Sequence, residues 1–292
     1  MRLRSVELEL PRRDAAVAFL RDTWGLLDAG RRGRTAFLRG AGDHPYLMSL
    51  TEAAAPRAAA ITFSGSEDEI GTVHARIATA GRPAPERVAA FDEPGAPSGF
   101  FVAGQEGQVF RFVADREPGA AIARPETPVQ LTHVVLNSLD REACARFTAD
   151  ALGFALSDRT RHMTFVRCNR KHHALAFAQS DAASLNHVAF EMADLDAVMR
   201  GVGRLRDLGL SPAWGPGRHG PGNNVFAYFI APFGAVVEYT AEVQEVDDTY
   251  RVGGPEDWKW PPNRIDHWGL STKDSARLGA AECTFRFRSE AS

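Results

Sequence analysis

Hydrophobic and polar positions along this chain follow one order twice. An alternating apolar stretch, typical of a strand, leads through a polar start signal into apolar residues at helical spacing. Two strands with a polar turn follow, then a strand, an acidic cap-like turn and a helix, and finally a hairpin. The matching stretches are 3–26 and 131–154, 35–50 and 163–177, 60–81 and 187–209, and 99–115 and 227–242. The sequence therefore predicts a duplication in which each half is a βαβββ unit twice over.

This order of elements favours an α+β fold. Only two helices accompany the strands of each half and each half ends in a hairpin, so we expect two curved, mostly antiparallel, barrel-like sheets with the helices outside. The proline-rich stretch 116–130 is typical of a linker. We predict a first module over 1–118, a second over 129–245 and a Trp- and Pro-rich tail over 246–292. Because three tryptophans are costly to leave in water, the tail is expected to pack over a surface or cover an opening.

Composition and charge narrow the class of protein. The chain has 292 residues, 44% of them hydrophobic, and a formal net charge of −3, which suits a globular protein with a substantial core. No run of Lys and Arg offers a surface for nucleic acid, and no stretch approaches the roughly 20 apolar residues of a membrane span. Three widely spaced cysteines without a CxxC motif fit a reducing compartment, so we expect a cytoplasmic protein.

Three matched positions differ between the halves. Aligning the repeats places Ser5 opposite His133, Ala60 opposite His187 and Arg111 opposite Glu238. Only the second half therefore carries metal-ligand side chains at all three places. A lone histidine on an apolar strand is more often a core residue than a ligand, so only the three residues together indicate a metal site.

Glu238 is the least expected of these residues. In GAVVEYTAE it shares a strand face with Val236, and an unpartnered carboxylate in a core costs several kcal/mol. A metal ion would remove this cost. Two imidazoles and one carboxylate leave about three open positions on an octahedral ion, an arrangement that suits Fe(II) and oxygen chemistry; Mn(II) also fits these donors. Zinc is chemically possible, but the chain has no HExxH motif of a hydrolytic zinc site.

The motifs around these residues resemble those of a known family. LTHVV, CNRKHHALAF, LNHVAFEMADLD and GPGRHGPGNNVFAYFIAPFGAVVEYTAE are similar, in order and spacing, to the type I extradiol ring-cleaving dioxygenases of the vicinal oxygen chelate (glyoxalase/bleomycin resistance/dioxygenase) superfamily. The likeness covers about 1–245 and is strongest after 130. It implies paired βαβββ modules, a metal only in the second half, and Fe(II)-dependent cleavage of a catecholic substrate by O2 to a muconic semialdehyde-type product. It also implies a homo-oligomer.

The resemblance assigns roles to six residues. It makes His133, His187 and Glu238 the Fe(II) ligands. It places His173 beside the oxygen site as an acid–base group, and it makes His219 and Tyr228 hydrogen-bonding partners of the substrate's oxygens, so these three are the predicted catalytic residues. Two departures leave the identity of the diol open, because Asn186 stands where many members of the family have histidine and the loop reads GPGNN.

Other functions remain open at this stage. A related isomerase or lyase would share four ligands between modules, which Ser5, Ala60 and Arg111 do not provide. A protein that only sequesters a ligand needs a cavity but no metal, and the complete His/His/Glu set argues against it. The glycines between 215 and 222 do not open a helix as phosphate-binding loops do, and no GxSxG motif indicates a serine hydrolase. Phe177, Phe190, Phe226 and the tail are expected to line a cavity with room for a hydrophobic substituent.

Overall fold

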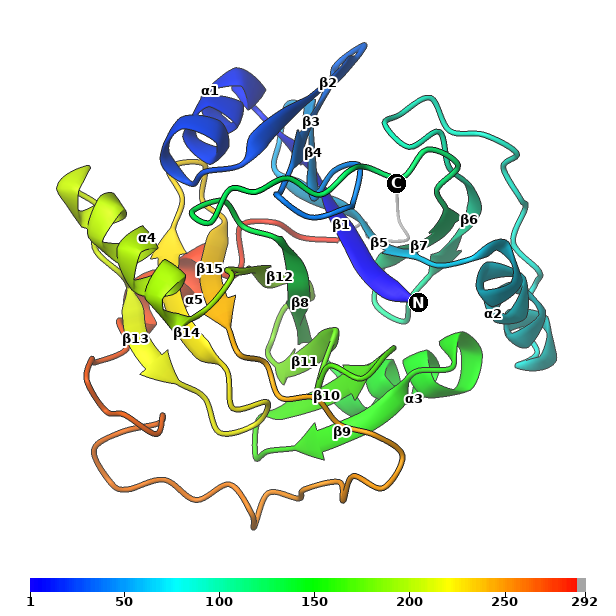
Figure 1. The fold of residues 1–292 in the computed structure, drawn as a ribbon. Coiled ribbons are helices and arrows are strands. Elements are labelled where there is room, and N and C mark those ends of the chain that lie inside the picture. The colour runs from blue at the N-terminus through cyan, green and yellow to red at the C-terminus, as the bar shows by residue number, and fades with distance from the viewer. Residues whose placement is uncertain (288–292) are drawn as a thin grey trace.

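The computed structural model describes residues 1–287, and its first half forms a seven-stranded sheet. The strands lie in the order β2-β3-β4-β1-β5-β7-β6 (Figure 1). Their bounds are β1 Arg2–Leu10, β2 Leu27–Arg32, β3 Thr35–Arg39, β4 Met48–Glu52, β5 Arg57–Ser64, β6 Ser98–Ala103 and β7 Val109–Ala114. The helical segments of this half are α1 Arg13–Ala18, its continuation η1 Phe19–Thr23, and α2 Glu67–Thr79.

The second half forms an eight-stranded sheet in the order β13-β14-β15-β12-β8-β11-β10-β9. Its strands are β8 Gln130–Ser138, β9 Ala155–Arg159, β10 Met163–Arg167, β11 Leu175–Gln179, β12 Ser184–Glu191, β13 Trp214–Arg218, β14 Val225–Ile230 and β15 Val236–Ala241. The helices are α3 Arg141–Leu152, α4 Leu195–Asp207 and α5 Ser275–Ala281. At the centre, β8 and β12 run antiparallel, and each has a parallel neighbour on its other side, β11 and β15.

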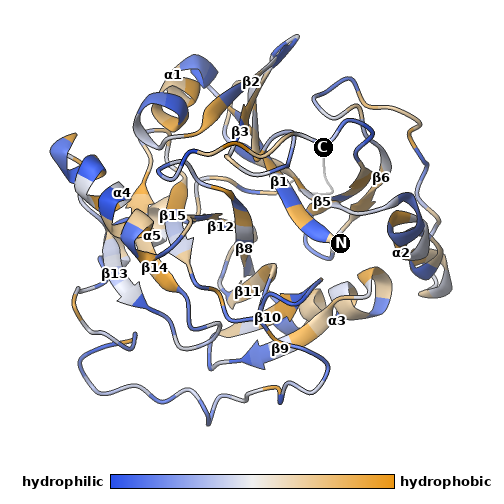
Figure 2. Ribbon diagram, in the orientation of Figure 1, coloured by the Kyte–Doolittle hydropathy of each residue, from blue (hydrophilic) through white to orange (hydrophobic). Residues whose placement is uncertain are grey.

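The expected α+β class with mostly antiparallel sheets is confirmed. Helices α1, α2, α3 and α4 lie at the periphery of the sheets (Figure 1), and hydrophilic and hydrophobic residues both occur along α1, α2 and α4 (Figure 2). The sheets are not closed barrels, since β9 and β13 end the second sheet as separate edges. The second half has the predicted βαβββ pattern twice, whereas in the first half α2 is followed by only two strands, β6 and β7.

Three edge strands were not located by the sequence pattern. β2, β9 and β13 each pair on one side only, and their sequences LDAGRR, ALSDR and WGPGR are polar or rich in glycine. Polar residues and glycines are common on edge strands, which pair with a neighbour on one side only, so these segments lack a regular apolar alternation. The glycine-rich segment before Val225, expected to be a loop, therefore contains a strand.

The starts of α2, α3 and α4 follow the predicted polar signals, whereas α1 begins after Arg12 without a side-chain cap. Ser66 Oγ accepts a hydrogen bond from the Glu69 backbone N–H, and the Glu69 carboxylate accepts one from the Ser66 backbone N–H, which together form a complete capping box at α2. Asp140 and Asp194 cap α3 and α4, and Gly153 ends α3 in a left-handed conformation.

The two halves share one hydrophobic core. The Trp24 ring stacks on Tyr239 of β15 with 3.7 Å between centroids, and it also meets Phe190 and Phe229 edge-on. Buried apolar residues from both sheets belong to the same cluster. The division into two domains and a tail stays a prediction, but this shared core packs strands of the second half against the first half.

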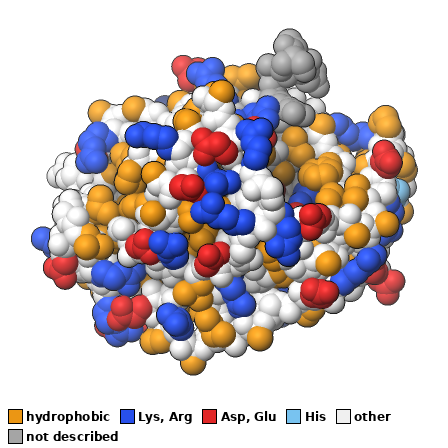
Figure 3. Space-filling model, turned by 90° about the horizontal axis from the view of Figure 1, so that it is seen from above, with side chains coloured by type: hydrophobic (Ala, Val, Ile, Leu, Met, Phe, Trp, Pro, Cys, Tyr) orange, Lys and Arg blue, Asp and Glu red, His pale blue; other side chains and the backbone are white. Residues whose placement is uncertain are grey.

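The tail is largely irregular before α5. Beyond α5, Phe285 and Phe287 are buried in the shared core, and Arg286 forms isolated bridges with Arg57 and Ser184 from the two halves. Within residues 1–287, no helix combines the length and apolar character needed to cross a membrane. Positive and negative side chains are interspersed on the face shown in Figure 3.

Candidate metal centre

His133, His187 and Glu238 come together in the second half. They lie on β8, β12 and β15, three adjacent strands, and all three are buried. One potential ligand atom from each lies within 4.8 Å of the others, and within residues 1–287 no other group of three His, Cys, Asp or Glu residues gathers in this way. The Glu238 Oε2 atom lies 3.3 Å from His133 Nε2 and 3.2 Å from His187 Nε2.

The donor geometry fits a metal ion. Although Glu238 Oε2 is buried and close to both Nε2 atoms, it makes no hydrogen bond of acceptable geometry within the described chain. A buried carboxylate oxygen without a hydrogen bond is costly, whereas lone pairs aimed at a common centre are what a cation requires. Burial raises the pKa of the Glu238 carboxyl, but attraction to His133 and His187 outweighs burial and holds that pKa below its ordinary value. The site therefore fits a divalent metal.

Neighbouring polar groups orient the three donors. His133 Nδ1 lies 2.9 Å from Thr132 Oγ1, and His187 Nδ1 lies 2.7 Å from Asn186 Oδ1. Because an amide oxygen only accepts, His187 carries its proton on Nδ1 and presents an Nε2 lone pair to the metal position. Asn224 donates a long hydrogen bond of 3.4 Å to Glu238 Oε1, leaving Oε2 to face the histidines. In the sequence Asn186 stands out only as a departure from the family motif, and no motif marks Thr132 or Asn224.

The three predicted catalytic residues lie around this centre. The His173 ring is 4.2 Å from the His133 ring, and Tyr228 donates to or accepts from His219 Nε2 at 2.9 Å. Burial lowers the pKa of His219 to about 3, and burial together with neighbouring imidazoles lowers that of His173 well below its usual value. Burial also raises the pKa of Tyr228. At neutral pH the three groups are therefore uncharged hydrogen-bonding partners.

An ion-pair network occupies the matching place in the first half. The strand registers of the two halves correspond at this place. In the first half Ala60 pairs with Glu7, and Thr62 pairs with Arg111. In the second half His187 pairs with Val135, and Ala189 pairs with Glu238, so Ala60 matches His187 and Arg111 matches Glu238. Arg111 bonds the Glu93 carboxylate at 2.6 and 2.8 Å. Its other partners are Tyr46 and Thr62. A buried guanidinium paired in this way excludes a second cation from this position.

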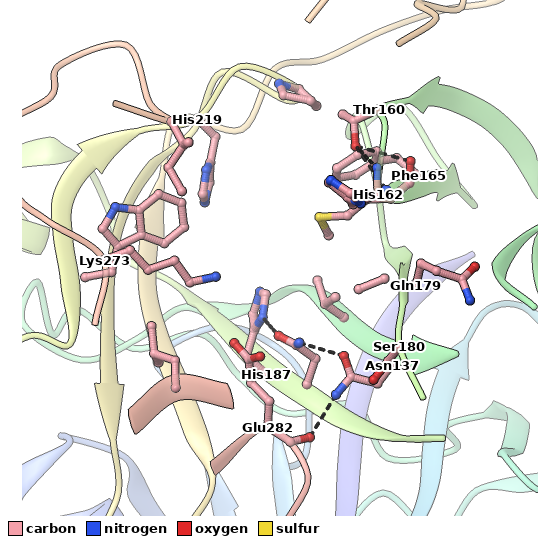
Figure 4. Close-up of a pocket in the computed structure, with 18 of the residues that line it drawn as sticks. Asn137, Thr160, His162, Phe165, Gln179, Ser180, His187, His219, Lys273 and Glu282 are labelled. Atoms are coloured by element: carbon pink, nitrogen blue, oxygen red, sulfur yellow. Dashed lines mark hydrogen bonds between the residues drawn. The ribbon is translucent and has the colours of Figure 1, made fainter. Parts of the chain in front are cut away.

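A cavity of about 750 Å³ opens beside the metal position. Figure 4 shows His187 and His219 on its wall, with Lys273 of the tail pointing into it. Trp258 and Trp260 also line it, so the tail covers an opening as expected. Lys273 had no motif around it that would reveal this position in the sequence.

The expectation that Phe177, Phe190 and Phe226 line this cavity is wrong. The first two lie in the shared core, because they point to the opposite strand face from the cavity residues Ala178 and His187. Phe226 is screened from the cavity, since His219 stacks on it with 4.0 Å between ring centroids. The apolar wall is formed instead by Met163, Phe165, Trp214, Trp258, Trp260, Ile265 and Leu278.

Comparisons with known proteins agree with this arrangement. Residues 130–239 match the model of the Glyoxalase/Bleomycin resistance protein/Dioxygenase superfamily. The structure of a Mn(II)-bound glyoxalase from Novosphingobium aromaticivorans is 35% identical, covers 95% of this chain and 93% of its own, and superposes with a TM-score of 0.85. The chain belongs to this superfamily.

Curated relatives are similar over shorter segments. Metapyrocatechase 2 of Cupriavidus necator is 34% identical over 122 residues, which are 41% of this chain and 38% of the relative. Biphenyl-2,3-diol 1,2-dioxygenase of Paraburkholderia xenovorans (strain LB400) is 32% identical over 171 residues, 55% of this chain and 56% of the relative. The chain thus spans about half or less of the length of these two relatives.

Proposed function

We propose that this protein is an extradiol dioxygenase. It opens the ring of a catechol-type diol at the bond next to the two hydroxyl-bearing carbons, incorporates both atoms of O2 and releases a muconic semialdehyde-type product. The observation that carries this proposal is the buried group of two imidazoles and one carboxylate at the end of a cavity. Such a group leaves adjacent positions of an octahedral ion open for a diol and O2. The names of the curated relatives support the same reaction.

Fe(II) is the proposed metal, held by Nε2 of His133, Nε2 of His187 and Oε2 of Glu238. When bound, it would supply the Lewis-acid and redox chemistry that joins an aromatic diol to O2. The chain contributes the orientation of the donors through Thr132 and Asn186.

The surrounding residues bind the substrate and move protons. His173, uncharged and beside His133, is the proposed acid–base group that takes a proton from a substrate hydroxyl and returns it to the product. Tyr228 and His219, already bonded to each other, are the proposed hydrogen-bonding partners of the substrate oxygens. Burial keeps the Tyr228 hydroxyl protonated, so it remains a donor to an oxyanion.

The cavity favours a diol with an apolar substituent. Its volume of about 750 Å³ exceeds the needs of a bare catechol ring, and Trp214, Trp258 and Phe165 offer aromatic surface. We propose an aryl- or alkyl-substituted catechol as the substrate class.

A Mn(II)-dependent isomerase is the second candidate, because one structure that is 35% identical and similar over 95% of this chain is that of a Mn(II)-bound glyoxalase. An isomerase of the four-ligand type would draw donors from both halves, whereas the matching place in the first half holds Arg111 and its ion pairs. The donor set therefore favours the dioxygenase.

One experiment separates the two candidates. The full chain is reconstituted anaerobically with Fe(II) or Mn(II) and then mixed with aerated catechol, 4-alkylcatechol or 2,3-dihydroxybiphenyl. We expect one O2 consumed per yellow ring-fission product, with the substituted diols giving the higher kcat/KM. Isomerisation of a 2-oxoaldehyde thiohemiacetal without O2 uptake, and no ring fission with either metal, would overturn the proposal in favour of the isomerase.

A matched pair of variants tests the ligand assignment in the same assay. Glu238→Gln is expected to lose both metal retention and turnover. Glu191→Gln makes the same chemical change on β12 but alters a residue that pairs with Lys171 away from the cavity, and it is expected to keep both. Full activity in Glu238→Gln would refute its role as a ligand.

A further inference from the structure

A buried hydrogen-bonded chain of three side chains ends at His173. Asp158 lies on β9, and His172 directly precedes His173 in the turn before β11; both have 0% exposure. Asp158 Oδ2 lies 2.8 Å from His172 Nε2, and His172 Nδ1 lies 3.0 Å from His173 Nδ1. His172 and Asp158 do not line the cavity.

The hydrogen-bond partners of the two histidines constrain the positions of their protons. A carboxylate only accepts hydrogen bonds, so His172 carries a proton on Nε2. When His172 carries this one proton, its Nδ1 atom is an acceptor and the proton between the two rings belongs to His173 Nδ1. Within residues 1–287 no protein group bonds His173 Nε2, and the ring lines the cavity. The free lone pair of His173 is therefore on Nε2, where it is available to a substrate.

We propose that Asp158 and His172 are positioning residues that hold His173 in the Nδ1–H tautomer, so that Nε2 receives the substrate proton. In this step the substrate O–H bond breaks, an N–H bond forms at His173 Nε2 and the diol oxygen becomes an oxyanion. The positive charge on His173 is stabilised through its Nδ1–H bond to His172, which Asp158 polarises in turn. The inference rests on the proposed function, because it deepens the role of His173 in ring cleavage.

The tail holds Asp158 in place for this task. Asp158 Oδ1 accepts from the Gly253 backbone N–H at 2.6 Å, and the Tyr250 hydroxyl donates to the carboxylate at 3.1 Å. In Figure 1 the tail runs past β9. A Cβ at Gly253 would lie 2.8 Å from Asp158 Oδ1, so glycine permits this close approach. Tyr250 and Gly253 thus join the tail to the Asp158–His172–His173 chain, while Trp258 and Trp260 join it to the cavity.

Asp158→Asn is expected to reverse the direction of the hydrogen bonds that run from residue 158 through His172 to His173, while keeping the shape of the side chain. The amide oxygen is expected to stay on the Gly253 N–H, which turns the NH2 group toward His172 Nε2. That nitrogen then becomes an acceptor, His172 carries its proton on Nδ1, and His173 is left with its proton on Nε2. We expect kcat to fall by roughly 10²- to 10⁴-fold, the range of general acid–base catalysis, with KM for the diol and the dissociation constant of Fe(II) within about threefold of wild type.

A double-mutant cycle separates this role from a structural one. If Asp158 acts only through His173, Asp158→Asn causes no further loss of kcat in a His173→Phe background, whereas independent structural damage would add to it. Asp266→Asn is the matched control, since Asp266 is a buried tail carboxylate that accepts from the backbone N–H groups of Trp268 and Gly269 and does not line the cavity. Additive losses, or an equal loss in Asp266→Asn, would overturn the proposal.

Histidine side-chain NMR tests the proton positions without turnover. The full chain is labelled with ¹⁵N-histidine and loaded with Zn(II), a diamagnetic ion that the same donors bind. We expect long-range ¹H–¹⁵N spectra to show His173 protonated on Nδ1 and His172 on Nε2, with both reversed in Asp158→Asn. The opposite tautomer of His173 in the wild type, or no change in the variant, would overturn the positioning role. Failure of the dioxygenase proposal is recognised separately, as absence of ring fission by the wild-type Fe(II) protein.

Discussion

The Asn186–His187 hydrogen bond makes a quantitative prediction about metal affinity. Asn186 Oδ1 accepts from His187 Nδ1 at 2.7 Å, and the Asn186 amide donates to Asn137 Oδ1 at 2.8 Å. Asn186→Ala removes the acceptor that fixes the tautomer of His187. Loss of a buried hydrogen bond of this kind costs about 1–3 kcal/mol, and each 1.4 kcal/mol is a factor of ten in a dissociation constant. We therefore expect the dissociation constant of Fe(II) to rise by roughly 10- to 100-fold.

Asn186→Asp is the matched variant for this prediction. It keeps an acceptor for His187 Nδ1 but loses the donor to Asn137, so it is expected to bind Fe(II) at least as tightly as wild type. The assay is anaerobic competition of each protein with a chelator of known affinity. Wild-type affinity in Asn186→Ala would refute the reasoning. Equal weakening in both variants would also refute it, because the lost contact with Asn137 would then be the cause.

Two further predictions concern stability. Arg111→Met removes the two-point guanidinium partner of the Glu93 carboxylate, which keeps Arg4 Nη1 at 3.6 Å and the Tyr46 hydroxyl, so we expect a loss of about 3 kcal/mol, the low end for a broken buried pair, in urea unfolding with unchanged Fe(II) affinity; a stability within 1 kcal/mol of wild type would contradict it. In α4, a Cβ at Gly201 would lie 2.8 Å from the Tyr239 ring, whereas one at Gly203 meets nothing within 4 Å. Gly201→Ala is therefore expected to destabilise by about 1–3 kcal/mol and Gly203→Ala to stabilise by about 0.5–1 kcal/mol, and equal shifts in thermal melting would contradict this pair.

The sequence predicted the duplicated order of the main elements and the three converging donors, but not the edge strands β2, β9 and β13. Glu238 stood out because the alternation of its strand turns its carboxylate toward the protein interior. Arg111 occupies the matching position of the first half, which indicated that only the second half keeps a metal-ligand side chain there. The same alternation, applied to Ala178 and His187, would have placed Phe177 and Phe190 in the core rather than in the cavity.

Other features depend on contacts between distant segments. Asp158 lies on an edge strand with little apolar pattern, and its partners Tyr250 and Gly253 come from the irregular tail about 90 residues later. No spacing rule links such residues, because the approach of the tail is set by packing of the whole chain. Lys273 reaches the cavity for the same reason. Sequence patterns predict elements and faces, whereas these contacts require the tertiary structure.

The central claim is that His133, His187 and Glu238 bind one metal ion, and a crystal structure of the Mn(II)-loaded protein tests it most directly. An anomalous difference map recorded at the manganese edge is expected to show one strong peak per chain, within bonding distance of Nε2 of both histidines and of Glu238 Oε2. A peak bonded to other residues, or no peak at this place in crystals saturated with Mn(II), would contradict the claim.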